Sequence, residues 1–249
     1  NVVDPTFPVK GFGHKQVSSF TNFLKEKKIS TKKEKKPGSV EEKNLSNNTI
    51  NINLRSIQAF LNWLEKEKFI LEAPKIEQVK VDTPLPKFLT PAELDKIYSF
   101  TSDEKLLATF RVYEGLGLRL NELQHAELEG DFIKINAKDS KGRRDRIIPL
   151  PDDIKEDFAI ATQEPYRTDY VSKTFTKLAK KAGITRTLHS LRHTFALRTL
   201  MQTKDLNMVK ELLGHSQIST TMIYTKFPKD YLKTVLMDNM SDKKLKATA

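Results

Sequence analysis

The sequence predicts a mainly α-helical protein that carries one small antiparallel β-hairpin and is divided into two domains. Three observations support this fold class. Apolar residues recur at three- and four-residue spacing through most of the chain. Alternating strand-like patterns occur in residues 132–135 and 146–150. A proline-interrupted stretch, residues 71–88, separates two helical regions, and a chain of 249 residues is long enough for two modest cores.

The first region contains two predicted helices with a basic segment between them. Val17, Phe20 and Leu24 predict a helix over residues 14–28. A run of lysines then leads into Pro37 and predicts a basic loop, which is either a solvated segment or a phosphate contact. A second apolar stripe, from Ile50 through Leu54 to Leu64, predicts the best-defined helix of this region.

The predicted linker and the start of the second domain come from proline positions. Pro74, Pro84 and Pro86 prevent a continuous helix, so residues 71–88 are expected to be extended, with the domain boundary near Pro84. After this boundary, Thr90 and Glu93 form a capping pair around a proline and predict a helix start. The second domain is expected to open there.

The second domain is predicted to be helical apart from its hairpin. Residues 104–116 form one helix that ends at a glycine pair, and the hairpin carries a basic tip, residues 138–145. Three further apolar stripes predict the remaining helices, with these positions: Phe175, Leu178 and Ala182; Leu188, Leu191, Phe195 and Leu200; Leu206, Val209, Leu212 and Leu213.

Composition narrows the function classes. The formal net charge of +11 favours a polyanionic partner, because neutralised phosphates release counterions. The chain has no cysteine, which excludes disulfides and thiolate metal sites and is compatible with a cytoplasmic protein. No apolar run reaches the length of a membrane span, so no membrane partner is expected.

Polar residues at the predicted helix ends occur in a specific order. Arg119 is followed by Glu122, then come the lysines of the hairpin tip, and His189, Arg192 and His193 share one helix face. The chain ends the series with Gly214-His215 and, nine residues later, Tyr224. This order resembles the tyrosine recombinase (phage integrase) family in residues 117–123, 141–150, 189–196 and 212–224, so that the resemblance covers about residues 86–227.

The resemblance implies a role for six residues. Arg119 and Arg192 would grip the scissile phosphate, and Tyr224 would attack phosphorus to form a 3′-phosphotyrosine. The resemblance also implies roles for two further residues. Lys141 would protonate the leaving 5′-oxygen, and His189 would help to manage the tyrosine proton.

His215 would hydrogen-bond the phosphate, which completes the six. Lys138 is an alternative to Lys141 at a shifted register. Glu122 is expected to orient Arg119 or cap its helix, and His193 to be a structural hydrogen-bonding partner.

The resemblance also implies an assembly and a reaction without cofactors. Residues 1–85 would be a helical core-binding domain, and residues 86–249 the catalytic domain with a C-terminal docking helix at about 228–240. The two would close around double-stranded DNA as a C-shaped clamp, and four copies would hold two duplexes. Neither metal nor ATP would be needed, and a mobile-element integrase and a chromosome-dimer resolvase fit equally well.

Three rival functions remain open at this point. A catalytically inactive, integrase-like DNA-binding regulator would explain the charge. A type IB topoisomerase-like relaxase would use related tyrosine chemistry. A metal hydrolase would use His189, His193 and His215 as ligands, although the chain lacks the glutamate of a His-Glu-x-x-His motif.

Overall fold

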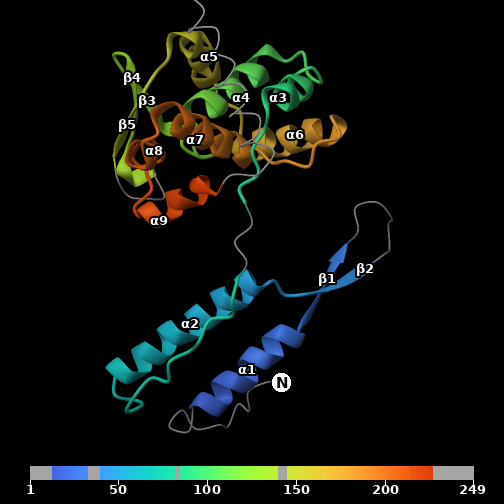
Figure 1. The fold of residues 1–249 in the computed structure, drawn as a ribbon. Coiled ribbons are helices and arrows are strands. Elements are labelled where there is room, and N and C mark those ends of the chain that lie inside the picture. Colours follow the sequence, from blue (N-terminus) through green and yellow to red (C-terminus); the bar gives the residue numbers. More distant parts are fainter. Residues whose placement is uncertain (1–12, 33–39, 82–84, 140–144, 227–249) are drawn as a thin grey trace, which may run out of the picture. The chain divides into compact units, whose positions relative to one another are not determined.

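The computed structural model describes residues 13–32, 40–81, 85–139 and 145–226. The chain divides into two compact units, Asn1–Thr83 (unit 1) and Pro84–Ala249 (unit 2), and each is described by itself. Helices dominate both units and the strands form two small antiparallel sheets, which confirms the predicted fold class (Figure 1). Lys141 and the expected helix at 228–240 lie outside the described residues.

Unit 1 is built on two helices that run in opposite directions. They are α1 (His14–Glu26) and α2 (Asn47–Lys66), drawn in blue and cyan in Figure 1. The predicted apolar stripes form their contact: Val17 packs with Leu61 and Leu64, and Leu24 packs with Ile50 and Leu54. The side chain of Ser46 caps α2 by accepting a hydrogen bond from the Thr49 amide, which satisfies a free backbone donor at the helix start.

The basic segment between these helices was expected to be a loop, and this prediction was wrong for its two ends. They form β1 (Lys28–Lys32) and β2 (Val40–Asn44), which pair in an antiparallel register from Lys28 opposite Asn44 to Lys32 opposite Val40. The many charged residues made the few β-branched residues hard to recognise as a strand pattern. A cross-strand ion pair between Lys28 and Glu42, at 3.4 Å, offsets part of the charge of the two strands.

The expected linker is extended, but its first part is fixed to unit 1. Asn51, which is buried on α2, donates to the Val79 carbonyl and accepts from the Val79 amide, each at 2.8 Å. Gln58 accepts from the Ile76 amide at 2.7 Å. Two amide side chains of the helix thus replace the backbone partners that an isolated extended strand lacks.

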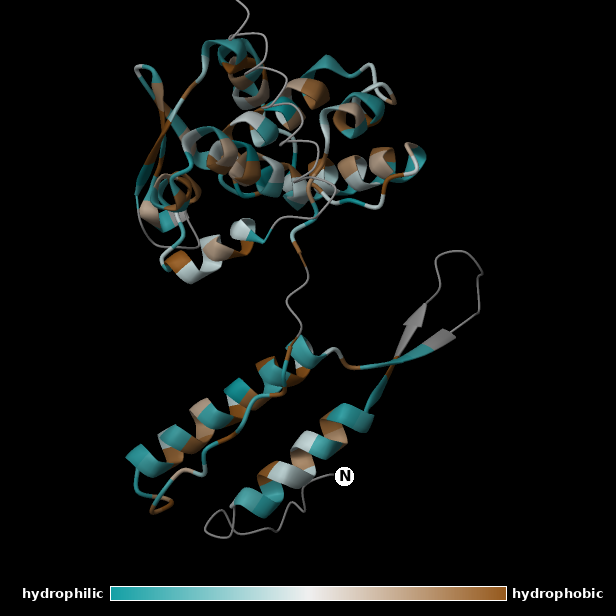
Figure 2. Ribbon diagram, viewed as in Figure 1, coloured by the Kyte–Doolittle hydropathy of each residue, from teal (hydrophilic) through white to brown (hydrophobic). Residues whose placement is uncertain are grey.

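Unit 2 surrounds one large apolar core with helices from several parts of the chain. Figure 2 shows apolar residues, in brown, distributed over these helices, and most of the buried ones belong to one large core cluster. None of the helices in the described ranges combines the length and apolar character of a membrane span. The α-helices of this unit are α3 (Pro91–Tyr98), α4 (Glu104–Leu116), α5 (Asp152–Gln163), α6 (Thr168–Lys181), α7 (His189–Thr203), α8 (Leu206–Leu213) and α9 (Ile218–Thr221).

Short 3-10 helices join this framework, among them η2 (Leu123–His125), η3 (Ala137–Asp139) and η4 (Met222–Thr225). The helix ends follow the predicted chemistry. Thr90 and Glu93 form the expected capping box at α3, with the Glu93 amide donating to the Thr90 hydroxyl and the Thr90 amide to the Glu93 carboxylate. Gly117 ends α4 in the left-handed conformation, at φ +60°.

The sheet of unit 2 has three strands in the order β3–β4–β5, all antiparallel. The predicted pair β4 (Phe132–Ile135) and β5 (Arg146–Pro149) is confirmed, with Ile133 opposite Ile148 and Ile135 opposite Arg146. Strand β3 (Ala126–Glu129) was not anticipated, because two of its four residues are glutamates, and α5 was missed as well.

Candidate active site

The first turn of α7 presents its polar residues to one pocket. His189, Arg192 and His193 lie three and four residues apart and therefore share a helix face. Arg192 is almost completely buried, while the His189 side chain is exposed and His193 lies between these extremes. The rings of the two histidines meet edge to face with centroids 4.6 Å apart.

Two helix ends fix the guanidinium of Arg192. One nitrogen donates to the Gly117 carbonyl at 2.7 Å and another to the Leu213 carbonyl at 2.5 Å. Both carbonyls lie at helix C-terminal ends, of α4 and α8, where the helix dipole favours a cation. Burial, followed by the charge of Arg119, lowers the pKa of Arg192 to about 9, so it remains charged at neutral pH.

Arg119 follows the end of α4 and reaches the same pocket. Its side chain remains 22% exposed. It donates to Glu122 at 2.8 Å and to the Gly214 carbonyl at 3.2 Å, and its backbone amide donates to Glu122 at 2.6 Å. Glu122 thus contacts Arg119 in the way expected of an orienting residue.

Glu122 has a second partner, Arg146, for which the sequence predicted no role. Arg146 is buried on β5 and donates to both carboxylate oxygens of Glu122, at 2.8 and 2.5 Å. Burial alone would raise the pKa of Glu122, but the hydrogen bonds and charges of Arg146 and Arg119 hold it at about 2. One ionised carboxylate therefore offsets part of the charge of three guanidiniums, since Arg192 also lies 3.8 Å from it.

The turn after α8 places His215 beside Arg192. Gly214 ends the helix at φ +62°, and a Cβ added there would lie 3.0 Å from Cδ of Arg146. The Nδ1 atom of His215 hydrogen-bonds Thr221 at 2.9 Å, and its Nε2 lies 3.4 Å from Arg192. Burial, together with Arg192 and the other nearby cations, lowers the pKa of His215 to about 4.

Tyr224 lies in η4 and is only 2% exposed, packed against Leu197 and Val209 in a small second core. Its hydroxyl lies 3.0 Å from Nδ1 of His193. Burial raises the pKa of Tyr224, and the two arginines act against this rise. The tyrosine is therefore held as a neutral phenol at neutral pH.

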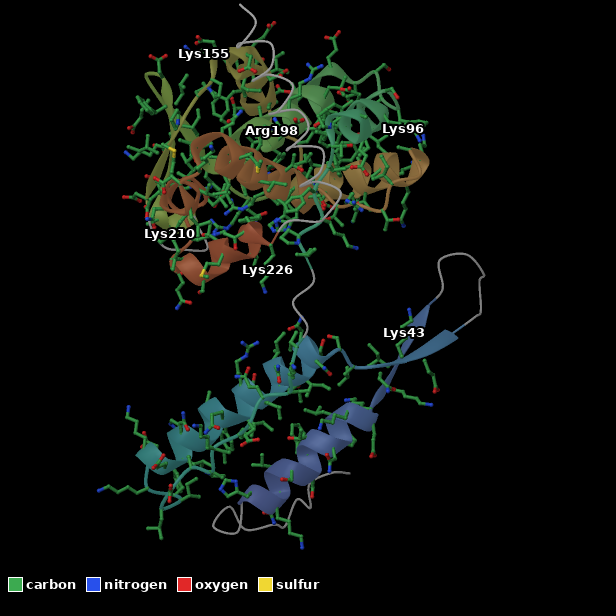
Figure 3. The ribbon with its side chains drawn as sticks, viewed as in Figure 1. Lys43, Lys96, Lys155, Arg198, Lys210 and Lys226 are labelled. Atoms are coloured by element: carbon green, nitrogen blue, oxygen red, sulfur yellow. The ribbon has the colours of Figure 1, made fainter. Side chains whose placement is uncertain are left out.

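These residues line one pocket with a volume of about 390 Å³. Five of the six predicted site residues meet there, and the alternative acid Lys138 is exposed on η3. Figure 3 shows Lys210 and Lys226 beside α8 and α9, next to this end of unit 2. The pocket is lined by Arg119, His189, Arg192, His193, Gly214, His215, Ser216, Thr220, Ile223 and Tyr224.

The arrangement is suited to binding an oxyanion next to a nucleophile. The guanidiniums of Arg119 and Arg192 line this pocket together with Tyr224 and with His193 and His215, whose lowered pKa values leave them neutral at physiological pH. In the described ranges no three histidine, aspartate or glutamate side chains gather in a way that could hold a metal ion. The charge for binding an anion here comes from arginine.

Comparison with known proteins identifies the family of the chain. Residues 153–230 match the model of the phage integrase family. The tyrosine recombinase XerA of Thermococcus onnurineus (strain NA1) is 34% identical over 212 residues, which are 76% of this chain and 74% of XerA. The chain belongs to the tyrosine recombinase family of enzymes.

Solved structures share the fold. A lambda integrase dimer bound to a COC′ core site has a TM-score of 0.67 at 19% identity, with 90% of this chain and 83% of that chain covered. The Tn1549 transposon integrase in complex with transposon right end DNA has a TM-score of 0.68 at 20% identity, covering 94% and 87%.

Proposed function

We propose that this chain is a site-specific DNA recombinase that cleaves and rejoins DNA through a 3′-phosphotyrosine bond at Tyr224, without metal or ATP. The observation that carries the proposal is the meeting of the Tyr224 hydroxyl with Arg119 and Arg192 in one pocket. The membership of the family and the bound DNA of the solved relatives support it.

The arginines would act on the scissile phosphate. Arg192 is held by carbonyls of two helix ends, and Arg119 is braced by Glu122, so both are positioned before DNA binds. Each would donate to non-bridging oxygens, whose negative charge grows as the pentacoordinate phosphorus forms. A fixed guanidinium stabilises this charge without reorganising during the reaction, which a flexible lysine would not do as well.

Strand cleavage would then be one displacement at phosphorus. The Tyr224 oxygen attacks, a bond from phosphorus to this oxygen forms, and the bond to the 5′-oxygen breaks. Lys141 at the hairpin tip would give its proton to the leaving 5′-oxygen. Because the phosphotyrosine keeps a diester bond, religation to another 5′-hydroxyl reverses the step and needs no energy source.

The proposal includes the wider assembly. Residues 1–85 would contact one side of the DNA and residues 86–249 the other, as a C-shaped clamp, and four copies would hold two duplexes through the segment at about 228–240. The net charge of +11 supports a DNA partner, because each phosphate contact by a cation releases counterions. Strong salt dependence of DNA binding is therefore part of the proposal.

A catalytically inactive regulator and a relaxase are the competing functions. An inactive DNA-binding protein has no need for a phenol buried beside two guanidiniums, and Tyr224 with this surrounding favours an enzyme. A relaxase would form the same covalent bond but would not exchange strands between two duplexes. Joining of strands from two labelled duplexes therefore separates it from a recombinase.

The test of the proposal starts from duplexes selected from a random-sequence library by their affinity for the Tyr224→Phe variant. A selected duplex carrying a nick that traps the cleaved product is incubated with each protein in excess chelator. Wild type is expected to give a covalent complex on a denaturing gel, and Tyr224→Phe to give none while binding equally tightly. Absence of the complex with wild type, with binding intact, would refute the proposal.

A further inference from the structure

We propose that His193, rather than His189, is the catalytic residue that takes the proton from the Tyr224 hydroxyl during strand cleavage. The inference rests on the proposed function and deepens it. The family resemblance implied a proton role for His189, and His193 was expected to be only a structural partner. The geometry of the pocket assigns the role to the other histidine of the pair.

His193 is in direct contact with the nucleophile. Nδ1 of His193 lies 3.0 Å from Oη of Tyr224, within the range from which a proton transfers directly. The ring of His189 instead meets the ring of His193, with centroids 4.6 Å apart. The ring contact of His189 is thus with His193 and not with the nucleophile, and its side chain is exposed.

The surroundings of His193 keep its imidazole uncharged. The groups facing His193 are His189 and Arg192 on its own helix, Tyr224 on η4, and Arg119 and His215 across the pocket. Burial, then His189 and Arg192, lowers the pKa of His193 to about 4. The imidazole is therefore neutral at physiological pH, and with its hydrogen on Nε2 its Nδ1 accepts from the phenol.

Two protons move during strand cleavage. As the bond from Tyr224 to phosphorus forms, the phenol proton moves to His193 Nδ1, while the leaving 5′-oxygen takes a proton from Lys141. The protein gains one proton and loses one. The negative charge of a bound phosphodiester beside the ring favours the imidazolium that results, so DNA raises the proton affinity of His193 where it is needed.

The fold also explains why this contact is rigid. Arg192, the residue before His193, is held by two carbonyls, and Thr194, the residue after it, donates to Ser190 and accepts from the Leu89 amide at 2.9 Å. Tyr224 is packed against Leu197, one turn further along α7. Both partners of the proton transfer are therefore fixed to the same helix.

The experiment compares His193→Asn with His189→Asn. Asparagine places a polar atom near the position of Nδ1 but cannot take up a proton in this pH range. The rate of covalent complex formation is measured at saturating selected duplex from pH 6 to 9, and fluorescence anisotropy of the labelled duplex shows that each variant is folded and binds. Wild type and both variants are also prepared with 3,5-difluorotyrosine at position 224, whose phenol is more acidic and ionises without a proton acceptor.

The wild-type rate is expected to be nearly independent of pH in this range. His193→Asn is expected to be at least about a hundredfold slower at pH 7, with a rate that rises with pH as the phenol ionises. With 3,5-difluorotyrosine at position 224 its defect is expected to shrink to less than about tenfold, whereas the effect of His189→Asn stays unchanged. A purely structural role of His193 would move neither the pH slope nor the response to fluorination.

Three results would overturn the inference. The first is a pH profile of His193→Asn parallel to that of wild type. The second is a defect that fluorination does not reduce, and the third is equal or greater relief of His189→Asn. Absence of covalent complex with wild type would instead refute the proposed function itself, and the role of His193 with it.

Discussion

The buried Glu122 carboxylate is expected to be a main support of unit 2, and Glu122→Gln tests this at nearly constant shape. Glutamine keeps the volume but removes the negative charge that lies beside Arg119, Arg146 and Arg192. The pKa of Glu122 is held at about 2, against an ordinary value of 4.5. At about 1.4 kcal/mol for each tenfold change in affinity for a proton, the native state is stabilised by roughly 3 kcal/mol at neutral pH.

The pH dependence has a definite sign. Because the folded pKa lies below the unfolded one, the stabilisation is complete above about pH 4.5 and is lost as the pH falls toward about 2. Urea unfolding of wild type and Glu122→Gln is therefore expected to differ by about 3 kcal/mol at pH 7 and by progressively less below pH 4.5. Circular dichroism is the suitable probe, since the single tryptophan, Trp63, lies on α2 of unit 1.

Glu129→Gln is the matched control. Glu129 forms a 2.8 Å ion pair with Lys134 on the partly exposed sheet surface, and such pairs contribute at most about 1 kcal/mol. A loss below about 1 kcal/mol for Glu122→Gln at pH 7, or a difference between it and wild type that does not change with pH, would refute the reasoning.

Two further predictions concern the turn after α8 and the hairpin tip. Gly214→Ala is expected to lower the melting temperature more than Gly183→Ala: both glycines have a left-handed φ, but only the Cβ at position 214 meets a neighbour, Arg146 at 3.0 Å. Equal melting temperatures for the two variants would contradict this contact. Lys141→Ala is expected to slow covalent complex formation, and a substrate with sulfur in place of the bridging 5′-oxygen is expected to restore the rate, because a thiolate leaves without an acid. Restoration of Lys138→Ala instead of Lys141→Ala would assign the acid to Lys138.

The parts of the fold that were predicted correctly have local causes. The capping pair of Thr90 and Glu93 defines the start of α3 within four residues of sequence. Glycines at the end of α4 and α8 mark turns that other residues adopt only with strain. The order of polar residues indicated six candidate residues, and five of the six meet in one pocket.

The parts that were missed depend on contacts between distant residues. Glu122 and Arg146 are 24 positions apart, and no local pattern marks them as partners. The alternation along β5 does contain a signal, since Arg146 shares its face with the buried Ile148. A buried arginine on a strand must find a carboxylate or carbonyls, so this position could have been recognised as part of a network.

The contact of His193 with Tyr224 could not be predicted from the sequence either, because it depends on how α9 and η4 pack against α7. Nothing in the spacing of His189 and His193 indicates which of them would face a tyrosine 31 residues further along the chain. The ends β1 and β2 of the basic segment were missed for a different reason: their lysines and glutamates outweigh the few β-branched residues.

The role of Tyr224 as nucleophile is tested most directly by identifying the residue that becomes covalently joined to DNA. The covalent complex with the selected, nicked duplex is digested with nuclease and trypsin and analysed by mass spectrometry. We expect a nucleotide attached through its 3′-phosphate to Tyr224, in the tryptic peptide that spans residues 211–226. Attachment to any other residue, or a 5′-phosphate linkage, would contradict this role.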